Sequence, residues 1–273
     1  MTLLQYPGKK NAIAKWIVSH FPANYQKMTY LEPFFGSGSI FFCKERSVIE
    51  TINDVDNEVA NLFMQIRDKP DELVYMIMNT PWSRAEYDLS FEQTDDPVEQ
   101  ARRCIIRFWF TFGANVRLKN GMRFEILRNS GGLSNFHLNL PEIIAMAAER
   151  LKHNRKSLVQ IENRNVFDLI PKYNRGNVLM YLDPPYLLET RKHKKVYKHE
   201  LTCDEHEDLL KLICHSKAKI IISGYMNELY ACYLKDWRLE QTTAKDQAGN
   251  RKTECIWMNY EGKQSNLFVG GNV

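Results

Sequence analysis

The sequence lacks long hydrophobic runs, and this absence argues against a membrane-spanning protein. Its apolar runs, such as residues 40–43 and 220–222, are far shorter than the roughly 18 to 20 residues that a transmembrane helix needs. Residues 7–10, Pro-Gly-Lys-Lys, stand where the apolar part of a secretory signal would begin. We therefore expect a cytoplasmic protein that makes no membrane contact.

Paired cysteines and a dominant charge are also missing. The six cysteines include no Cys-x-x-Cys pair, and no histidine pair lies near one at zinc-finger spacing. We therefore expect reduced thiols and no metal site. The net charge of +4 permits a polyanionic partner without requiring one. A length of 273 residues, with 44% hydrophobic and 26% charged residues, is typical of a globular protein of one or two domains.

Short apolar strands alternate with amphipathic helices along most of the chain. Strands are predicted over residues 28–32, 47–52, 158–161, 178–182 and 219–223. Helices are predicted over residues 39–43, 57–67, 204–215 and 226–234. This alternation predicts an α/β fold, a mainly parallel sheet with helices on both faces.

Two parts of the chain depart from this alternation. The extended runs 237–243 and 253–260 flank turn residues and predict a terminal β-hairpin at the sheet edge. Between residues 79 and 141 the composition shifts from an acidic stretch to a basic, aromatic one. We therefore expect a smaller inserted domain over 79–141 and one larger domain built from residues 1–78 and 142–273.

A glycine-containing turn follows the first predicted strand. Residues 32–38, Glu-Pro-Phe-Phe-Gly-Ser-Gly, let the backbone approach a ligand closely at the switch point of a sheet. Asp54 ends the next strand, where a carboxylate can accept both hydroxyls of a ribose. Together they favour a nucleoside-containing ligand. The alternatives are a turn with no ligand and a helix cap at Asn53 or Asp54, although Asp56 or Asn57 suits the cap better.

The sharpest motif, Asp183-Pro184-Pro185-Tyr186, directly follows the apolar strand 178–182. The prolines remove two backbone donors and leave carbonyl acceptors beside one carboxylate and one aromatic ring. Such groups suit an amino group on a flat ring, because Asp183 and the Pro184 carbonyl can accept from the amine while Tyr186 stacks on the base. The alternative is a purely structural Pro-Pro turn.

Four segments, in this order and with an insertion before the last, resemble the Dam-type, or D12 class, DNA adenine methyltransferases. They are residues 6–10, 32–38, 53–54 and 183–186. The resemblance covers nearly the whole chain. It implies a Rossmann-like methyltransferase sheet, an inserted target-recognition domain over 79–141, and a bacterial or phage origin. The implied activity is methyl transfer from S-adenosylmethionine to the N6 amine of a flipped-out adenine in a specific double-stranded DNA sequence.

The resemblance also assigns the contacts of S-adenosylmethionine. The glycine turn would line its methionine side, Asp54 would hold its ribose, and Lys10 would lie near its carboxylate. The full set of implied contacts is Tyr6, Gly8, Lys10, Phe35, Gly36, Ser37, Gly38, Asp54, Phe167, Asp168 and Asp183. The chain departs from the family pattern at Lys9, where a glycine is usual, and at Asp56, where asparagine is common.

The implied catalytic residues are Asp183, Pro184 and Tyr186. Adenine's amino lone pair is delocalised into the ring, so accepting its protons increases its nucleophilicity as attack begins. A target inside a duplex must be flipped out, and stacking on Tyr186 would offset part of the unstacking cost, a few kcal/mol.

Basic residues gather in two spans that we expect to contact DNA. Residues 102–128 hold seven basic residues and one acid, and their later part, 115–123, predicts a hairpin with Asn120 and Gly121 at its tip. The second span, 191–198, lies just beyond the catalytic motif. The predicted contacts are Arg117, Lys119, Asn120, Arg123, Arg191, Lys192, Lys194 and Lys195. The alternatives are a core role for the interleaved aromatics and solvated faces for the charges.

Other readings of the motifs stay open at this point. Related motifs serve RNA adenine and DNA cytosine methyltransferases, and glutamine methyltransferases carry a similar Pro-Pro-Tyr turn that usually begins with asparagine. A catalytically silent DNA-binding module would keep the basic spans without needing Asp54 or Asp183. The sequence leaves open whether a cognate restriction nuclease exists, and whether a monomer or a dimer acts on DNA.

Overall fold

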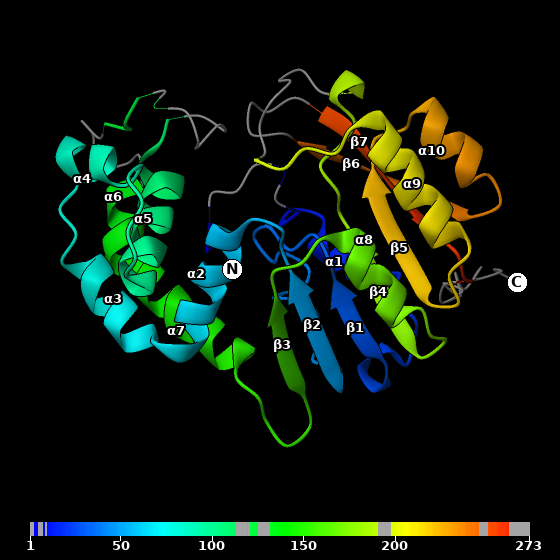
Figure 1. Cartoon of the computed structure of the whole chain (residues 1–273), viewed down its shortest axis with the longest axis horizontal. Coiled ribbons are helices and arrows are strands. Elements are labelled where there is room, and N and C mark those ends of the chain that lie inside the picture. Colours follow the sequence, from blue (N-terminus) through cyan, green and yellow to red (C-terminus); the bar gives the residue numbers. More distant parts are fainter. Residues whose placement is uncertain are drawn as a thin grey trace, which may run out of the picture.

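A twisted seven-stranded sheet is the centre of the molecule (Figure 1). The computed structural model describes residues 3–4, 8, 10–112, 119, 121–124, 132–190, 198–245 and 251–261. In spatial order the strands are β3 (Leu158–Glu162), β2 (Ile49–Asn53), β1 (Thr29–Glu32), β4 (Val178–Leu182), β5 (Lys219–Gly224), β7 (Arg251–Met258) and β6 (Arg238–Lys245). The first five are parallel.

The predicted terminal hairpin is confirmed and forms one edge of the sheet. β6 and β7 pair antiparallel, with Leu239 opposite Trp257, and β7 also pairs antiparallel with β5, with Gly224 opposite Cys255. β7 therefore lies between β5 and β6 and runs against the parallel strands. This direction brings the amino-terminal half of β7 to the edge at which the parallel strands end.

Successive side chains of a strand point to opposite faces of the sheet. The hydrophobic side chains therefore form two clusters, one on each face. In β4, which is buried throughout, Leu179 and Tyr181 join one cluster while Met180 and Leu182 join the other. The second cluster packs under α8 (Val166–Leu169), α9 (Cys203–Cys214) and α10 (Glu228–Tyr233); the first includes α1 (Ala14–Ser19) and α2 (Asn57–Asp68). Helices on both faces are thus confirmed.

The helix predicted over residues 39–43 is wrong. This segment forms successive turns, in which Phe42 N–H donates to the Gly38 carbonyl and Lys44 N–H to the Ile40 carbonyl, each at 2.9 Å. Gly36 and Gly38, just before this segment, have positive φ angles of 49° and 67°, so no regular helix can extend back through them. The chain then turns back to start β2, so too few residues remain for a stable helix.

Between β2 and β3 the described chain is largely helical, and its helices gather beside the sheet (Figure 1). Beyond α2 they are α3 (Pro70–Met78), α4 (Arg84–Leu89), α5 (Pro97–Phe110), α6 (Gly132–Ser134), a π-helix (Asn135–Asn139) and α7 (Leu140–Leu151). One continuous cluster of buried side chains runs from the sheet into α3, α5 and α7. None of the helices in the described ranges is long and apolar enough to cross a membrane.

The core role of the aromatics in α5 is confirmed, because Trp109 and Phe110 are buried. Phe112, just beyond the helix, is instead 70% exposed. The early arginines of the first basic span lie on no solvated face: Arg102 is buried between Glu86 and Glu99, and Arg107 pairs with Glu58. Acids outside the span therefore neutralise part of the positive charge counted within it.

A buried ion network joins the sheet to α7. Glu50 of β2 is paired with Lys44 and accepts two hydrogen bonds from Arg150, at 2.6 and 2.8 Å. Burial lowers the pKa of Lys44 to about 8. Burial alone would raise the pKa of Glu50, but hydrogen bonds from Arg150 and Lys44 outweigh it and hold the pKa below its usual value. Glu50 therefore supplies the negative charge that stabilises Lys44 and Arg150 in this network.

We expect Glu50→Ala to lower the free energy of unfolding by about 3–5 kcal/mol, because it leaves Lys44 buried without its carboxylate. Urea unfolding followed by circular dichroism measures this change. Glu149→Ala removes an exposed carboxylate of α7 that pairs with Lys152, and we expect it to change stability by less than about 0.5 kcal/mol. Equal effects of the two substitutions would contradict the structural role of the network.

Candidate active site

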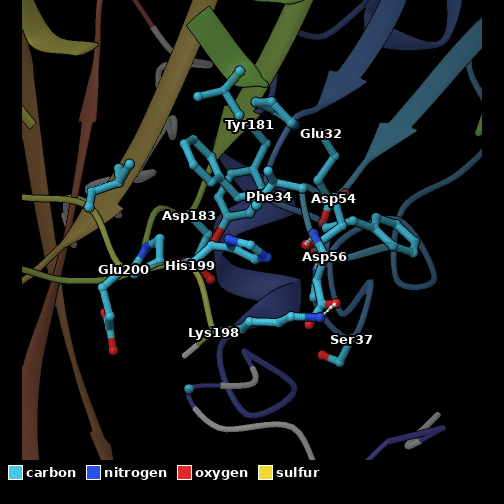
Figure 2. Close-up of a pocket in the computed structure, with 18 of the residues that line it drawn as sticks. Glu32, Phe34, Ser37, Asp54, Asp56, Tyr181, Asp183, Lys198, His199 and Glu200 are labelled. Carbon is cyan, nitrogen blue, oxygen red and sulfur yellow. Dashed lines mark hydrogen bonds and ion pairs between the residues drawn. The ribbon is translucent and has the colours of Figure 1, made fainter. Parts of the chain in front are cut away.

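The site lies where the strand order reverses. β1 and β4 are neighbours whose chains continue to opposite halves of the sheet, and ligands of open α/β sheets bind at the carboxyl ends of such strands. A cavity of about 350 Å³ opens there (Figure 2). It is lined by residues that follow β1, β2 and β4, together with α8 and the segment before α9. The lining includes Lys10, Glu32, Phe34, Gly36, Asp54, Asp56, Phe167, Asp183, Lys198 and Leu201.

Asp54 holds the glycine turn against the end of β2. Its carboxylate accepts from the backbone N–H of Gly36 at 2.8 Å and from that of Asp56 at 2.9 Å. Asp56, not Asp54, caps α2 by accepting from Glu58 N–H at 3.2 Å, as the sequence favoured. Gly38 is required by packing, since a Cβ there would lie 2.5 Å from the Phe35 ring.

Asp183 occupies the end of β4 at the opposite side of the cavity from Asp54 (Figure 2). Ser223, at the end of β5, donates to its Oδ1 at 2.7 Å, and Lys10 Nζ lies 3.4 Å from the same atom. Burial raises the pKa of Asp183, and the nearby Lys10 charge and the Ser223 hydrogen bond oppose that rise. Ser223 was missed by the sequence analysis, although its place at the end of a predicted strand beside β4 could have identified it.

Tyr186 does not line the cavity and belongs to a polar cluster with Lys10 and Glu254. Its hydroxyl donates to Glu254 Oε2 at 2.7 Å and accepts from Lys10. Lys10 Nζ also lies 4.4 Å from the centre of the Tyr186 ring, and the Tyr186 and Tyr225 rings are T-shaped to each other with their centres 4.6 Å apart. Glu254 was missed because a carboxylate in the middle of a hairpin strand carries no motif.

Glu32 contributes a buried carboxyl group to the cavity. Tyr30 donates to its Oε2 at 2.6 Å. Burial raises the pKa of Glu32 to about 8, and the Tyr30 hydrogen bond only partly opposes it. Near neutral pH the group therefore keeps its proton.

A segment ahead of α9 crosses the cavity. Lys198 Nζ lies 3.4 Å from Asp56 Oδ1 (Figure 2), and His199, Glu200 and Leu201 also line the cavity. Lys198 is the last residue of the second basic span, so at least this member of the span faces an acid of the protein. None of these contacts was predicted from the sequence.

The structure brings together most of the predicted cofactor contacts. Gly8, Lys10, Phe35, Gly36, Ser37, Asp54, Phe167 and Asp183 line the cavity, whereas Gly38 and the exposed Asp168 do not. Of the catalytic motif, Asp183 and Pro185 line it, while Pro184 and Tyr186 do not. Lys119 lies 3.5 Å from Asp88, and Arg123 donates to the Thr111 carbonyl. Outside the described residues lie Tyr6, Arg117, Asn120, Arg191, Lys192, Lys194 and Lys195.

The sheet and the cavity at its switch point define a Rossmann-like α/β enzyme. Residues 6–247 match the family described as D12 class N6 adenine-specific DNA methyltransferase, and the chain belongs to this family. It is thus an adenine-specific DNA methyltransferase.

The chain is also similar to individual proteins. The chain is 24% identical to the Type II methyltransferase M1.LlaDCHI of Lactococcus lactis subsp. cremoris, with 94% of each chain covered. Similar solved structures are a putative RNA methyltransferase of Pyrococcus horikoshii, 9% identical with a TM-score of 0.37, and the rRNA methyltransferase aviRa of Streptomyces viridochromogenes, 12% identical with a TM-score of 0.38. The matches cover 96% of this chain and 86% of the first, and 93% of this chain and 85% of the second.

The raised pKa of Glu32 predicts a specific pH dependence of stability. The folded state keeps the Glu32 proton up to about pH 8, whereas the unfolded chain releases it near its ordinary pKa. The folded state therefore binds more protons between these values, and stability falls as pH rises, by up to about 1.4 kcal/mol per pH unit. We expect Glu32→Gln to flatten this part of the profile in urea unfolding between about pH 5 and 7.5. Parallel profiles for the two proteins would contradict the assignment.

Proposed function

We propose that the enzyme transfers a methyl group from S-adenosylmethionine to the N6 amine of an adenine that is flipped out of a specific double-stranded DNA sequence. The observation that carries this proposal is the placement of Asp183. Its carboxylate stands at the end of β4, lines the cavity, and is held by Ser223 at 2.7 Å. A target base that enters from the DNA side would meet this carboxylate beside the cofactor.

The lining of the cavity fits S-adenosylmethionine. Asp54 places at the end of β2 a carboxylate, the group that accepts the ribose hydroxyls in such sites. Phe34 and Phe167 offer apolar surfaces for a purine, and Lys10 offers a cation for a carboxylate. When bound, the cofactor supplies an electrophilic methyl group on a positively charged sulfur. The carboxylates of Asp54, Asp56 and Asp183 suit that charge.

Asp183 is proposed to take the proton that the adenine amine loses. The amine becomes acidic only as its nitrogen gains the methyl group, so the acceptor need not be a strong base beforehand. The raised pKa of Asp183 makes its carboxylate a better acceptor, and the Pro184 carbonyl would accept a hydrogen bond from the second amine proton. Lys10 and Ser223 oppose the rise in the pKa of Asp183 and orient its carboxylate before attack.

Recognition of DNA is assigned to the helical part and the basic spans. We propose residues 79–141 as the target-recognition domain and residues 1–78 and 142–273 as the catalytic domain. Lys119 is exposed and pairs with Asp88 at 3.5 Å, and in the proposal it exchanges this partner for a phosphate. The contact of Arg123 with Thr111 suits a residue that supports the DNA-reading segment. A nuclease that cleaves the same sequence is the partner expected of a Type II system.

We expect Asp183→Asn to reduce methyl transfer by about a hundredfold or more, because the variant keeps the shape of the side chain but cannot take the proton. The assay incubates the protein with labelled S-adenosylmethionine and DNA from a methylation-deficient strain, followed by nucleoside analysis and mapping of modified positions. Labelled N6-methyladenine in one repeated sequence is the expected product of the wild type.

Asp236→Asn serves as the control, since Asp236 is exposed and remote from the cavity. Its activity should equal that of the wild type. Label that enters RNA alone would replace the DNA substrate of the proposal by RNA. Thermal stabilisation by the cofactor without any transfer to nucleic acid would make the chain a binding module.

Replacing Arg191, Lys192, Lys194 and Lys195 together by alanine should weaken binding to every DNA sequence alike. Each lost phosphate contact lowers the slope of log affinity against log salt by about 0.9. Fluorescence anisotropy with a short duplex at several salt concentrations measures the slope. The control replaces exposed lysines that precede strands at the other edge of the sheet, Lys27, Lys172 and Lys217. An unchanged slope in the first variant would remove the second basic span from the DNA interface.

A further inference from the structure

Glu254 is a buried carboxylate that neither the motifs nor the proposed chemistry uses. It lies on β7, next to Cys255, which pairs with Gly224 at the end of β5. Because β7 runs against β5, this position faces the edge of the sheet that carries Asp183. Glu254 is only 8% exposed, and a carboxylate buried to this degree is costly unless it is paired.

The partners of Glu254 are two residues of the active site. Tyr186 donates its hydroxyl proton to Glu254 Oε2 at 2.7 Å, and Lys10 Nζ lies 3.4 Å from the same oxygen. Lys10 also donates to the Tyr186 hydroxyl, so the three groups form a closed triangle. Lys10 reaches out of this triangle to Asp183 Oδ1, again at 3.4 Å.

We propose that Glu254 is a positioning residue that fixes the Tyr186 ring and shares the charge of Lys10 between itself and Asp183. The inference rests on the proposed function, in which Tyr186 stacks on the flipped adenine and Asp183 accepts its proton. Glu254 touches neither the base nor the reacting atoms in this scheme. It acts through the two residues that it holds.

The triangle restricts the Tyr186 ring at two places. The hydroxyl is anchored between Glu254 and Lys10, and the ring makes a T-shaped contact with the Tyr225 ring. A ring held by its hydroxyl and by this contact presents one orientation to a base. Without Glu254 the hydroxyl loses the acceptor of its proton, and the ring gains freedom that base binding must then remove at an entropic cost.

The triangle also sets how strongly Lys10 binds Asp183. Lys10 is 6% exposed and lies equally far from the carboxylates of Asp183 and Glu254. Removal of Glu254 leaves the buried ammonium to Asp183, and a tighter ion pair would occupy the carboxylate oxygen that the amine needs. Both effects slow the methyl-transfer step itself.

The test measures the single-turnover rate of methyl transfer with DNA and S-adenosylmethionine both saturating, so that weaker binding does not enter. We expect Glu254→Ala to lower this rate by about tenfold or more, which corresponds to the loss of one charge-assisted hydrogen bond. Glu254→Gln keeps an acceptor for Tyr186 but loses the charge, and its rate should lie between those of the wild type and Glu254→Ala. The matched control is Glu240→Gln on the neighbouring strand β6, where Glu240 pairs with Arg238, and it should be unchanged.

A double-mutant cycle with Tyr186→Phe separates positioning from general loss of structure. If Glu254 acts through the hydroxyl, Glu254→Ala should cost at least about threefold less in the Tyr186→Phe protein than in the wild type. The fluorescence of 2-aminopurine at the target position should report the same coupling in base flipping. If the fold reductions caused by Glu254→Ala and by Tyr186→Phe simply multiply in the double variant, the two residues act independently. This result would overturn the inference, even if both single variants are slow.

The outcomes for the inference and for the proposed function are distinct. A wild type that methylates DNA, with Asp183→Asn inactive and Glu254→Gln at the wild-type rate, overturns the inference alone. A wild type that methylates no adenine in DNA overturns the proposed function. If Glu254→Ala lowers the melting temperature, the single-turnover rate of Glu254→Gln decides, and a rate equal to that of the wild type overturns the inference.

Discussion

A buried carboxylate at the end of β4 is the constraint on which the rest of the site depends. Asp183 is tolerable there only because Ser223 donates to it and Lys10 brings a positive charge. Lys10 is itself buried and needs a second carboxylate, which Glu254 supplies. Through these ion pairs and hydrogen bonds, the charge at the switch point links the beginning of the chain, two central strands and the terminal hairpin.

The parts of the fold that the sequence predicted are those in which local pattern and burial agree. β4 is buried on both faces, and its five residues are hydrophobic. A wholly hydrophobic run between turn residues predicts a central strand. The helix after the glycine turn failed because Gly36 and Gly38 redirect the backbone. The early arginines were misjudged because the acids that neutralise Arg102 and Arg107 lie outside the counted span.

The residues of the candidate site likewise fall into those that a local sequence pattern predicts and those that it does not. Asp54 and Asp183 were predictable because each ends a parallel strand, and strand ends meet at one edge. Glu254 was not predictable, because its strand runs in the opposite direction and its approach to the site depends on the pairing of β7 with β5. The contact of Lys198 with Asp56 joins segments that are adjacent only after the sheet has formed.

The charge of the cavity differs from the charge that a surface needs to bind the phosphates of DNA. The cavity is lined by the carboxylates of Asp54, Asp56 and Asp183 against the ammonium groups of Lys10 and Lys198. A field of this sign favours a ligand that carries a positive charge and disfavours phosphates, which carry negative charge. Phosphate groups of DNA are therefore disfavoured in the cavity. The proposed flipping of an adenine, which would bring only an uncharged base to Asp183, is compatible with this charge.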